Sequence, residues 1–482
     1  MELIFERSVK GRKGVRLPKC DVPSAKDIPA KYKRKGISHL PEVSELDVVR
    51  HFTRLSRMNF SIDTHFYPLG SCTMKYNPKF MEDIAKLPGF SQLHPLLPQL
   101  LLGGMLTQGA LEVLYKIERV LAELTGMHEV TTEPMAGAHG ELTGMMLVAA
   151  YHRDRGNQKK YVIIPDSSHG TNPASATIAG YQTISIPTDK NGVMDFNQYE
   201  NKINSEVAAV MLTCPNTVGI FNSQIRQICS LAHRNDALVY YDGANLNAIL
   251  GKVRPGDIGF DIVHLNLHKT FATPHGGGGP GSGPVGVRKD LTRFLPVPKV
   301  IKRPDGTYAL EENRPKSIGR IASFYGNFDV LLKAYAYILL LGKEGLIEVS
   351  EKAVLNANYI MAGLKKHYDL PYDRICMHEC VFSAAKQLEK GVHALDIAKA
   401  LIDKGFHPPT IYFPLIVKEA IMIEPTETES KDTLDKFIEA MKEIAELSQT
   451  NPQAVKDTPL TTPVSRPDET KAVRELNLRW NP

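Results

Sequence analysis

The sequence predicts an α/β fold with a mostly parallel sheet, and a few segments of its 482 residues carry that prediction. Residues 161–164, 207–212 and 237–241 are continuous apolar runs of strand length, which is typical of strands buried on both faces. A helical pattern at 223–233 separates the last two of these runs. Alternating strands and helices indicate a parallel sheet with helices on both sides.

Polar side chains follow each of these predicted strands. His169 comes after the first run, Thr213 after the second, and Asp242 directly after the third. Parallel strands end at the same edge of a sheet, and ligands of α/β proteins bind outside that edge. We therefore expect these three side chains to lie around one binding site.

The stretch DIVHLNLHKTFATPHGGGGPGSG (261–283) contains the strongest chemical signal. An alternating apolar run predicts a buried strand that ends at Lys269, and the glycines at 276–279 allow backbone to approach a ligand closely. Partial burial of a lysine favours a neutral, nucleophilic amine, as a Schiff-base lysine requires. A metal site is the alternative, because His264, Asn266 and His268 would share one face of this strand, although no HExxH zinc motif is present.

Pyridoxal phosphate (PLP) is a cofactor that these residues could hold together. Asp242 would pair with the pyridine nitrogen and His169 would stack on the ring. The small-residue turn at 136–140 opens a helical run, where backbone N–H groups could bind the phosphate with help from His268. Each feature also has a plainer interpretation: an Asp-Gly turn, a histidine bonded within its own loop, and an ordinary helix N-terminus.

Five segments together resemble one enzyme family over nearly the whole chain. They are YPLGSCTMKYNP (67–78), HGTNPASA (169–176), YDGANLNA (241–248), HLNLHKTFATPHGGGGPGSGPVGV (264–287) and TPVSRPDETKAVRELNLRW (462–480). On these segments the sequence is similar to the P-protein of the glycine cleavage system, glycine dehydrogenase (decarboxylating), and within it to the PLP-carrying, carboxyl-half subunit of the split bacterial type.

This resemblance implies a fold, an activity and a set of site residues. The implied fold is that of the PLP-dependent transferases (aspartate aminotransferase-like, fold type I), with a smaller C-terminal α+β domain beside the large one. The implied reaction is decarboxylation of glycine with transfer of the aminomethyl group to the lipoyl arm of the H-protein. Lys269 would be the catalytic residue that holds PLP covalently, and the cofactor-binding residues would be Lys269, Asp242, His169, Ala138, His139, Thr213, Ala244 and His268.

The resemblance also implies partners, since single-chain P-proteins are about twice this length. We expect a homologous subunit 1 in an α2β2 tetramer, together with the lipoylated H-protein and glycine. Two alternatives stay open. The chain could be a catalytically silent subunit that completes a partner's site. It could also be another fold-type-I enzyme, such as an amino-acid decarboxylase or a cysteine desulfurase, although its cysteines are expected in strands or helices rather than in a mobile loop.

Composition excludes several other classes. The net charge of +5 is small for this length and predicts no nucleic-acid partner. No apolar stretch approaches membrane-spanning length, and residues 1–14 lack the apolar core of a signal peptide. The six cysteines are scattered, which predicts neither a zinc site nor a disulfide framework and fits a reducing cytoplasm.

The pattern along the chain predicts four parts. A helix at 328–341 is expected to connect two domains, and the prolines beyond residue 450 indicate extended chain. The expected parts are an extended N-terminal arm (1–60), a large PLP-binding α/β domain (61–330), a small α+β domain (331–450) and an extended C-terminal tail (451–482).

Overall fold

The structure is a computed structural model that describes residues 2–23, 28–33, 40–94, 97, 103–279 and 281–478. Pro280, within the 264–287 segment, and the last two residues of the 462–480 segment lie outside this description. The chain forms two compact units, of which one comprises residues 1–61 with 459–482 and the other residues 62–458.

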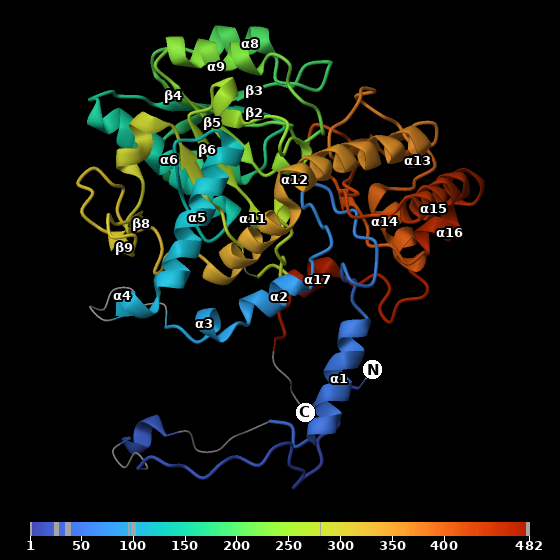
Figure 1. The fold of residues 1–482 in the computed structure, drawn as a ribbon. Helices are drawn as coiled ribbons and strands as arrows, with labels where there is room; N and C mark the ends of the chain where they lie inside the picture. The colour runs from blue at the N-terminus through green and yellow to red at the C-terminus, as the bar shows by residue number, and fades with distance from the viewer. Residues whose placement is uncertain are drawn as a thin grey trace. The chain divides into compact units, whose positions relative to one another are not determined.

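A seven-stranded sheet organises the larger unit (Figure 1). Its strand order is β1-β7-β6-β5-β4-β2-β3, and β7 runs antiparallel to both of its neighbours while the pairs from β6 to β3 are parallel. The predicted mostly parallel sheet is therefore confirmed. The strands are β1 (Glu129–Thr131), β2 (Tyr161–Pro165), β3 (Gln182–Ile186), β4 (Val207–Thr213), β5 (Leu238–Gly243), β6 (Ile262–Leu265) and β7 (Val285–Val287).

The apolar runs of the central strands supply both faces of this sheet. Alternate residues point to opposite sides of a strand, so Val239 and Tyr241 of β5 enter one core whereas Leu238 and Tyr240 enter another. The first core contains α5 (Gln108–Thr125) and α9 (Ile225–Arg234), and the second contains α6 (Gly137–Asp154). The sequence predicted α9 at 223–233, close to its observed bounds.

The segment around Lys269 differs from its prediction. Strand β6 ends at Leu265, and Lys269 lies in the short helix α11 (Leu267–Thr270), for which Asn266 is the N-cap. The expected single strand face of His264, Asn266 and His268 is therefore wrong. Leu265 and Leu267 are both buried, and their spacing of two residues is also typical of a strand. The backbone nevertheless turns from strand to helix between them.

The small domain follows two helical segments. Both are included in α12 (Phe328–Leu364), but the backbone leaves helical geometry at Gly342 (φ 60°, ψ −168°), so the first segment ends at 341, as the sequence predicted. A three-stranded antiparallel sheet packs under the remaining helices. These elements are β10 (Cys380–Ser383), β11 (Thr410–Ile411), β12 (Ala420–Ile423), α13 (Ala385–Leu388), α14 (Ala394–Asp403), α15 (Lys431–Thr450) and α16 (Pro452–Lys456).

Other segments of the larger unit are shorter. The polar stretch after β7 contains an antiparallel hairpin of β8 and β9. These remaining elements are α2 (Phe80–Ala85), α3 (Pro88–Ser91), α4 (Gly103–Leu106), α7 (Thr171–Ile178), α8 (Phe196–Lys202), η3 (Leu246–Ala248), α10 (Pro255–Ile258), η4 (Lys289–Phe294), β8 (Lys299–Lys302) and β9 (Tyr308–Glu311).

The sequence predicted an extended arm and an extended tail, but the smaller unit contains helices. It contains η1 (Ala30–Tyr32), α1 (Glu45–Arg57) and α17 (Glu469–Arg474). Helix α1 starts with a capping box in which the Ser44 hydroxyl accepts from the Asp47 N–H at 3.1 Å. The predictions of a wholly extended arm and tail are therefore wrong at α1, α16 and α17.

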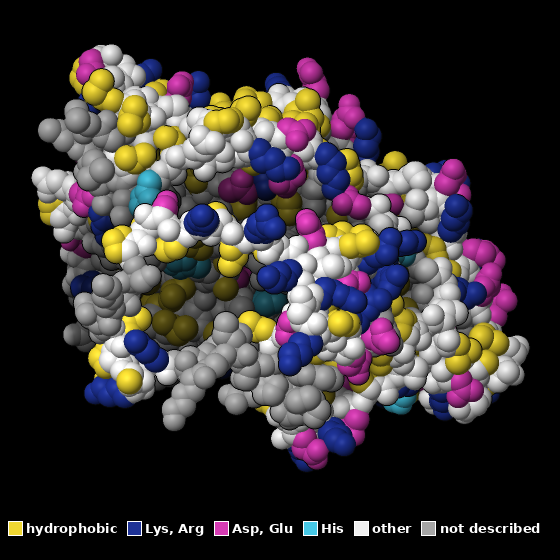
Figure 2. All heavy atoms as spheres, turned by 90° about the horizontal axis from the view of Figure 1, so that it is seen from below, with side chains coloured by type: hydrophobic (Ala, Val, Ile, Leu, Met, Phe, Trp, Pro, Cys, Tyr) yellow, Lys and Arg dark blue, Asp and Glu magenta, His cyan; other side chains and the backbone are white. Residues whose placement is uncertain are grey.

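Lys and Arg side chains lie among Asp and Glu side chains over most of the face in Figure 2. Within the described ranges, none of the helices combines the length and the apolar character that crossing a membrane requires.

Candidate functional site

A cavity of about 180 Å³ lies at the carboxyl ends of β4 and β5. This space is many times that needed for a single water, so it suits part of an organic ligand. The lining comes from segments far apart in the sequence, which the parallel strands bring to one edge. The lining residues are Ser71, Gly137, Ala138, Glu141, His169, Thr171, Thr213, Thr217, Asp242, Ala244, Asn245, Asn266, His268 and Lys269.

The sequence anticipated much of this lining. Lys269, Asp242, His169, Ala138, Thr213, Ala244 and His268 all reach the cavity, whereas His139 does not. The Nδ1 atom of His139 instead accepts a hydrogen bond from the Met135 N–H at 3.2 Å. His139 occupies the third position of α6 and turns back to the segment before that helix.

Asp242 is buried at the end of β5 and is held by several donors. Its Oδ1 accepts from the Ala244 N–H at 3.0 Å, and its Oδ2 accepts from Thr213 Oγ1 at 3.2 Å and from Asn172 Nδ2 at 3.3 Å. Burial by itself would raise the pKa of Asp242, but the adjacent His264 and these donors outweigh it and lower the pKa below its usual value. The cavity therefore contains a fixed negative charge on one wall.

His264 holds the other side of this carboxylate. Its Nε2 lies 3.4 Å from Asp242 Oδ1, and its Nδ1 lies 2.6 Å from the hydroxyl of Tyr240. Burial lowers the pKa of His264, so the ring is neutral. A Tyr240 hydroxyl that donates to Nδ1 leaves the proton on Nε2, where it faces Asp242.

Glu141 is a cavity residue that the sequence did not identify. Burial and the nearby Asp242 raise its pKa to about 7, so this carboxyl can hold a proton near neutral pH. Its Oε2 is buried without a hydrogen-bond partner. The signal was present, because Glu141 is one turn inside the helix that begins at the predicted phosphate-binding turn.

The first turn of α6 forms another wall. The helix begins at Gly137, and its N-cap residue Ala136 offers no side chain to the free N–H groups of the first turn. A side chain at position 137 would collide with Asn266 Oδ1, so glycine lets the helix start approach α11 closely. This arrangement presents backbone donors and positive helix-dipole charge to an anion.

Two histidines lie beside Lys269, and both are neutral at pH 7. The rings of His268 and His275 make an edge contact with centroids 5.2 Å apart. Burial lowers the pKa of His268 to about 3 and that of His275 to about 4. His268 Nδ1 is buried without a partner, as is His275 Nε2.

A second buried cluster comes from the small domain. His378 Nε2 lies 3.8 Å from Glu379 Oε1 and 3.9 Å from Glu424 Oε1, and all three side chains are fully buried. Burial lowers the pKa of His378 to about 3, raises that of Glu424 to about 6 and raises that of Glu379 strongly. In the described part of the chain, this is the only group of three or more His, Cys, Asp or Glu residues placed closely enough to hold a metal ion.

Backbone and hydroxyl donors of the 71–73 segment satisfy part of this cluster. The Ser71 N–H donates to Glu379 at 2.8 Å, and Thr73 donates twice to Glu424, at 2.6 and 2.7 Å. A protonated Glu379 beside an uncharged His378 leaves little net charge in the cluster. The adjacent pair of His378 and Glu379 was the available signal, but Glu424 is far from it in the sequence.

The position of one cysteine differs from expectation. Cys72 lies in a turn of the loop before α2 rather than in a strand or helix. Burial raises the pKa of its thiol to about 11, and the nucleophilic form of cysteine is the thiolate. The position of Cys72 in a turn is compatible with a cysteine desulfurase. Its thiol, however, is protonated, whereas a desulfurase requires the nucleophilic thiolate.

Together, the sheet order, the small α+β domain and the lysine, aspartate and helix start around one cavity define the aspartate aminotransferase-like fold of PLP-dependent transferases. The glycine cleavage system P-protein family model matches residues 21–306, and the glycine dehydrogenase C-terminal domain model matches residues 349–462. The chain belongs to this P-protein family.

Relatives and solved structures agree with this assignment. The chain is 55% identical over 482 residues to the probable glycine dehydrogenase (decarboxylating) subunit 2 of Caldanaerobacter subterraneus subsp. tengcongensis, covering 99% of this chain and 98% of the relative. It is 53% identical over 486 residues to the protein of the same name from Chloroherpeton thalassium, covering 100% and 98%.

Two solved structures share the fold at low sequence identity. An inhibitor-bound glycine decarboxylase (P-protein) superposes with a TM-score of 0.71 at 21% identity, covering 86% of this chain and 93% of that one. An apo cysteine desulfurase from Thermococcus onnurineus NA1 superposes with a TM-score of 0.61 at 15% identity, covering 79% and 95%.

Proposed function

We propose that this chain is the PLP-carrying subunit of a two-chain glycine dehydrogenase (decarboxylating). It would release CO2 from glycine and transfer the aminomethyl group to the lipoyl arm of an H-protein. The observation that carries the proposal is that Lys269, Asp242 and His169, on three separate segments, line one cavity in a chain of this family.

The residues around the cavity fit PLP in shape and charge. The backbone N–H groups at Gly137 and Ala138 suit the phosphate, and His268 Nδ1 is an unpartnered buried atom on the same wall. Asp242 is ionised and suits a protonated pyridine nitrogen. Lys269 extends from α11 into the cavity and supplies the amine that the cofactor aldehyde requires.

Bound PLP would supply an electron sink for the electrons that loss of CO2 leaves on the substrate carbon. The chain's own residues would prepare that chemistry. Asp242 keeps a negative charge at the ring nitrogen, Thr213 and Asn172 orient its carboxylate, and His264 supports it from behind. Glu141, whose pKa is about 7, would hold a proton at the cavity wall.

His169 would cover the open side of the ring. It is exposed, its Nδ1 lies 2.9 Å from Thr171 Oγ1, and its ring makes an edge contact with Phe413 of the small domain. These contacts limit the orientations of the imidazole. The same position would shield the substrate carbon from water after CO2 leaves.

The names of the relatives support a proposal for the assembly, and the cysteines support one for the location. We propose a homologous subunit 1 as the obligate partner, in an α2β2 tetramer, because the curated relatives are named as subunit 2. A lipoylated H-protein and glycine would be the substrates. All six cysteines are free, and a reducing cytoplasm suits them.

The test is the near-visible absorption spectrum of the purified chain with PLP, before and after borohydride reduction, with peptide mapping of the product. We expect a band that disappears on reduction and a modified Lys269. Glycine-dependent CO2 release should then require the partner subunit and lipoylated H-protein. No band with PLP and partner both present would overturn the proposal in favour of a silent subunit.

A further inference from the structure

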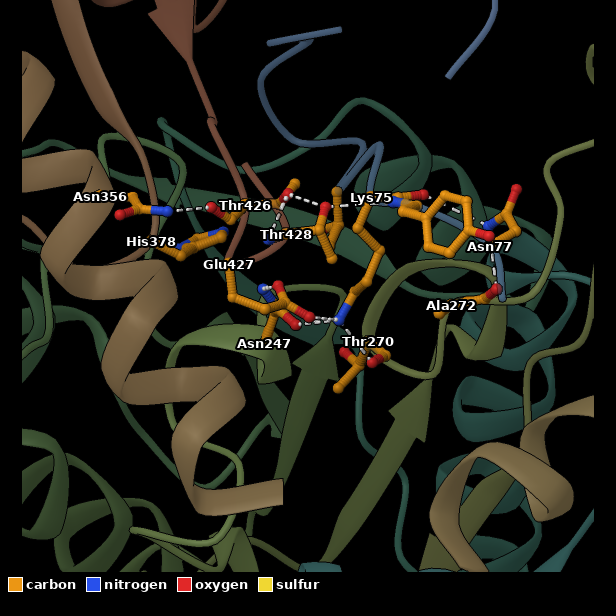
Figure 3. Close-up of polar contacts among 12 residues, drawn as sticks. Lys75, Asn77, Asn247, Thr270, Ala272, Asn356, His378, Thr426, Glu427 and Thr428 are labelled. Atoms are coloured by element: carbon orange, nitrogen blue, oxygen red, sulfur yellow. Dashed lines mark hydrogen bonds and ion pairs between the residues drawn. The ribbon is translucent and has the colours of Figure 1, made fainter. Parts of the chain in front are cut away.

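A second lysine near the cavity is fully buried and has three hydrogen-bond acceptors. Lys75 Nζ donates to Glu427 Oε1 at 2.6 Å, to Asn247 Oδ1 at 2.7 Å and to the carbonyl oxygen of Thr270 at 2.8 Å. Figure 3 shows the side chain pointing at these three groups. Asn247 Nδ2 also donates to Glu427 Oε2 at 3.2 Å, which closes the network.

This network satisfies the ammonium completely. An ammonium group has three N–H donors, and each has an acceptor here. Burial by itself would lower the pKa of Lys75, but the Glu427 carboxylate and the neighbouring Tyr337 side chain outweigh it and raise the pKa above the usual value. The charge is therefore permanent in the working pH range.

The acceptors belong to three different parts of the larger unit. Asn247 is in η3, which follows β5 and Asp242; Thr270 is the last residue of α11; and Glu427 follows β12 of the small domain. One cation thus connects the chain next to Lys269 with the small domain. The Thr270 carbonyl belongs to the residue directly after Lys269.

A neighbouring side chain holds the same turn at a second point. Asn77 Nδ2 donates to the carbonyl oxygen of Ala272 at 2.9 Å. Ala272 has φ 56°, a left-handed conformation that a residue with a side chain adopts only when its surroundings impose it. Lys75 and Asn77 therefore fix the backbone on the carboxyl side of Lys269, before and at this strained residue.

We propose that Lys75 is a positioning residue for Lys269, acting through the Thr270 carbonyl and the Glu427 carboxylate. The inference rests on the proposed function, in which Lys269 would hold the cofactor and would have to give it up to glycine and take it back in each turnover. A lysine that leaves and returns needs a fixed backbone, because small misplacements of a reacting group are costly in rate.

If Lys75 and Glu427 formed an ion pair that only stabilises the fold, the two measurements described below would give different results. Replacing Lys75 alone leaves the Glu427 carboxylate buried without a counter-charge, which destabilises the fold for a reason unrelated to positioning. The double variant Lys75→Met with Glu427→Met removes both charges and keeps similar volume. Lys79→Met is the matched control, because Lys79 lies four residues away and pairs only at the surface with Asp63.

The first measurement needs no cofactor. Amide hydrogen exchange of the full chain should become at least about tenfold faster at residues 267–273 in the double variant, and not in Lys79→Met. Helix α9, on another part of the sheet, reports global destabilisation. Unchanged exchange at 267–273, or an equal increase in α9, would overturn the inference whatever the status of the cofactor.

The second measurement uses the PLP-loaded chain with its partner subunit. Mixing with glycine should change the near-visible spectrum at least about tenfold more slowly in the double variant, with cofactor content and the Lys269 adduct unchanged. Wild-type rates in the double variant would overturn the inference. If the wild-type chain forms no Lys269 adduct, the proposed function fails, and the exchange data alone decide whether Lys75 fixes the turn.

Discussion

Lys75 and Lys269 belong to one neighbourhood of the fold but have opposite surroundings. Lys75 is fully buried and donates to three acceptors, whereas Lys269 is half-buried and, among the described residues, its amine has no hydrogen-bond partner. The comparison shows how one residue type can serve two purposes. Full satisfaction makes a lysine a structural cation, and an unsatisfied amine at a cavity is available for chemistry.

Removing the unsatisfied lysine should have the largest effect on activity. Lys269→Ala should lower glycine-dependent CO2 release on the order of 10³-fold or more, because the covalent attachment and the returning amine are lost together. The loss should occur without unfolding, which circular dichroism can check. Lys252→Ala removes a lysine paired at the surface with Glu351 and should keep full activity. Substantial activity in Lys269→Ala would show that the Lys269 amine is not required for the reaction and would contradict the comparison.

Removing the satisfied lysine should instead reduce stability. Lys75→Met should lower the free energy of unfolding by about 3–5 kcal/mol, since it leaves the Glu427 carboxylate buried without a counter-charge. The double variant with Glu427→Met should recover most of that loss. Urea unfolding of both variants measures the difference. Equal destabilisation of the single and double variants would show that the pair itself, rather than the orphaned charge, provides the stability.

The same contrast between satisfied and unsatisfied buried groups applies to carboxyl groups, of which Glu133 is an unsatisfied example. Both oxygens of Glu133 lack partners, and burial raises its pKa from 4.5 to about 8. Between pH 5 and 8 the folded state keeps a proton that the unfolded chain has released, so the free energy of unfolding should fall by roughly 3 kcal/mol as pH rises. Glu133→Gln should reduce the slope by about this amount and leave the contributions of the other buried carboxyls, such as Glu141 and Glu424, whereas the exposed Glu200→Gln should leave the whole slope unchanged. Unfolding curves across this pH range are the measurement.

The smallest effect is expected where a carboxyl is already neutral. Glu379 is protonated at pH 7 and accepts from the Ser71 N–H, so Glu379→Gln keeps the same charge and the same acceptor. Thermal unfolding should show a change of less than about 1 kcal/mol. A large loss would mean that Glu379 is ionised in the folded protein, and the protonation assigned to its cluster with His378 would then be wrong.

Local sequence patterns predicted much of the site because its geometry follows from strand ends. Residues after β2, β4 and β5 meet at one edge whenever parallel strands are buried, so His169, Thr213 and Asp242 could be placed together from apolar runs alone. The helical turn at Lys269 could not be recognised in this way. Leu265 and Leu267 are both buried, and their spacing of two residues also suits a strand.

The Lys75 network could not be predicted from the sequence, for a different reason. Its acceptors lie 172, 195 and 352 positions away in the chain, so no local pattern links them. The same applies to Glu424 beside His378 and Glu379. Packing of the small domain against the large one brings Glu427 to Lys75, and pairing of β10 with β12 brings Glu424 beside Glu379. Composition carries no trace of either arrangement.

Helix α12 connects the large domain to the small one. Its first turns pack in the core of the large domain through Leu331 and Ala334, and its last turns pack in the small domain through Ile360 and Leu364. The bend at Gly342 uses backbone angles that residues with side chains avoid. Residues that follow the bend, up to Val349, still pack in the core of the large domain. The bend therefore lies within the part of the helix that the large domain holds. A substitution at position 342 would disturb how the helix lies on that core while leaving every cavity residue chemically intact.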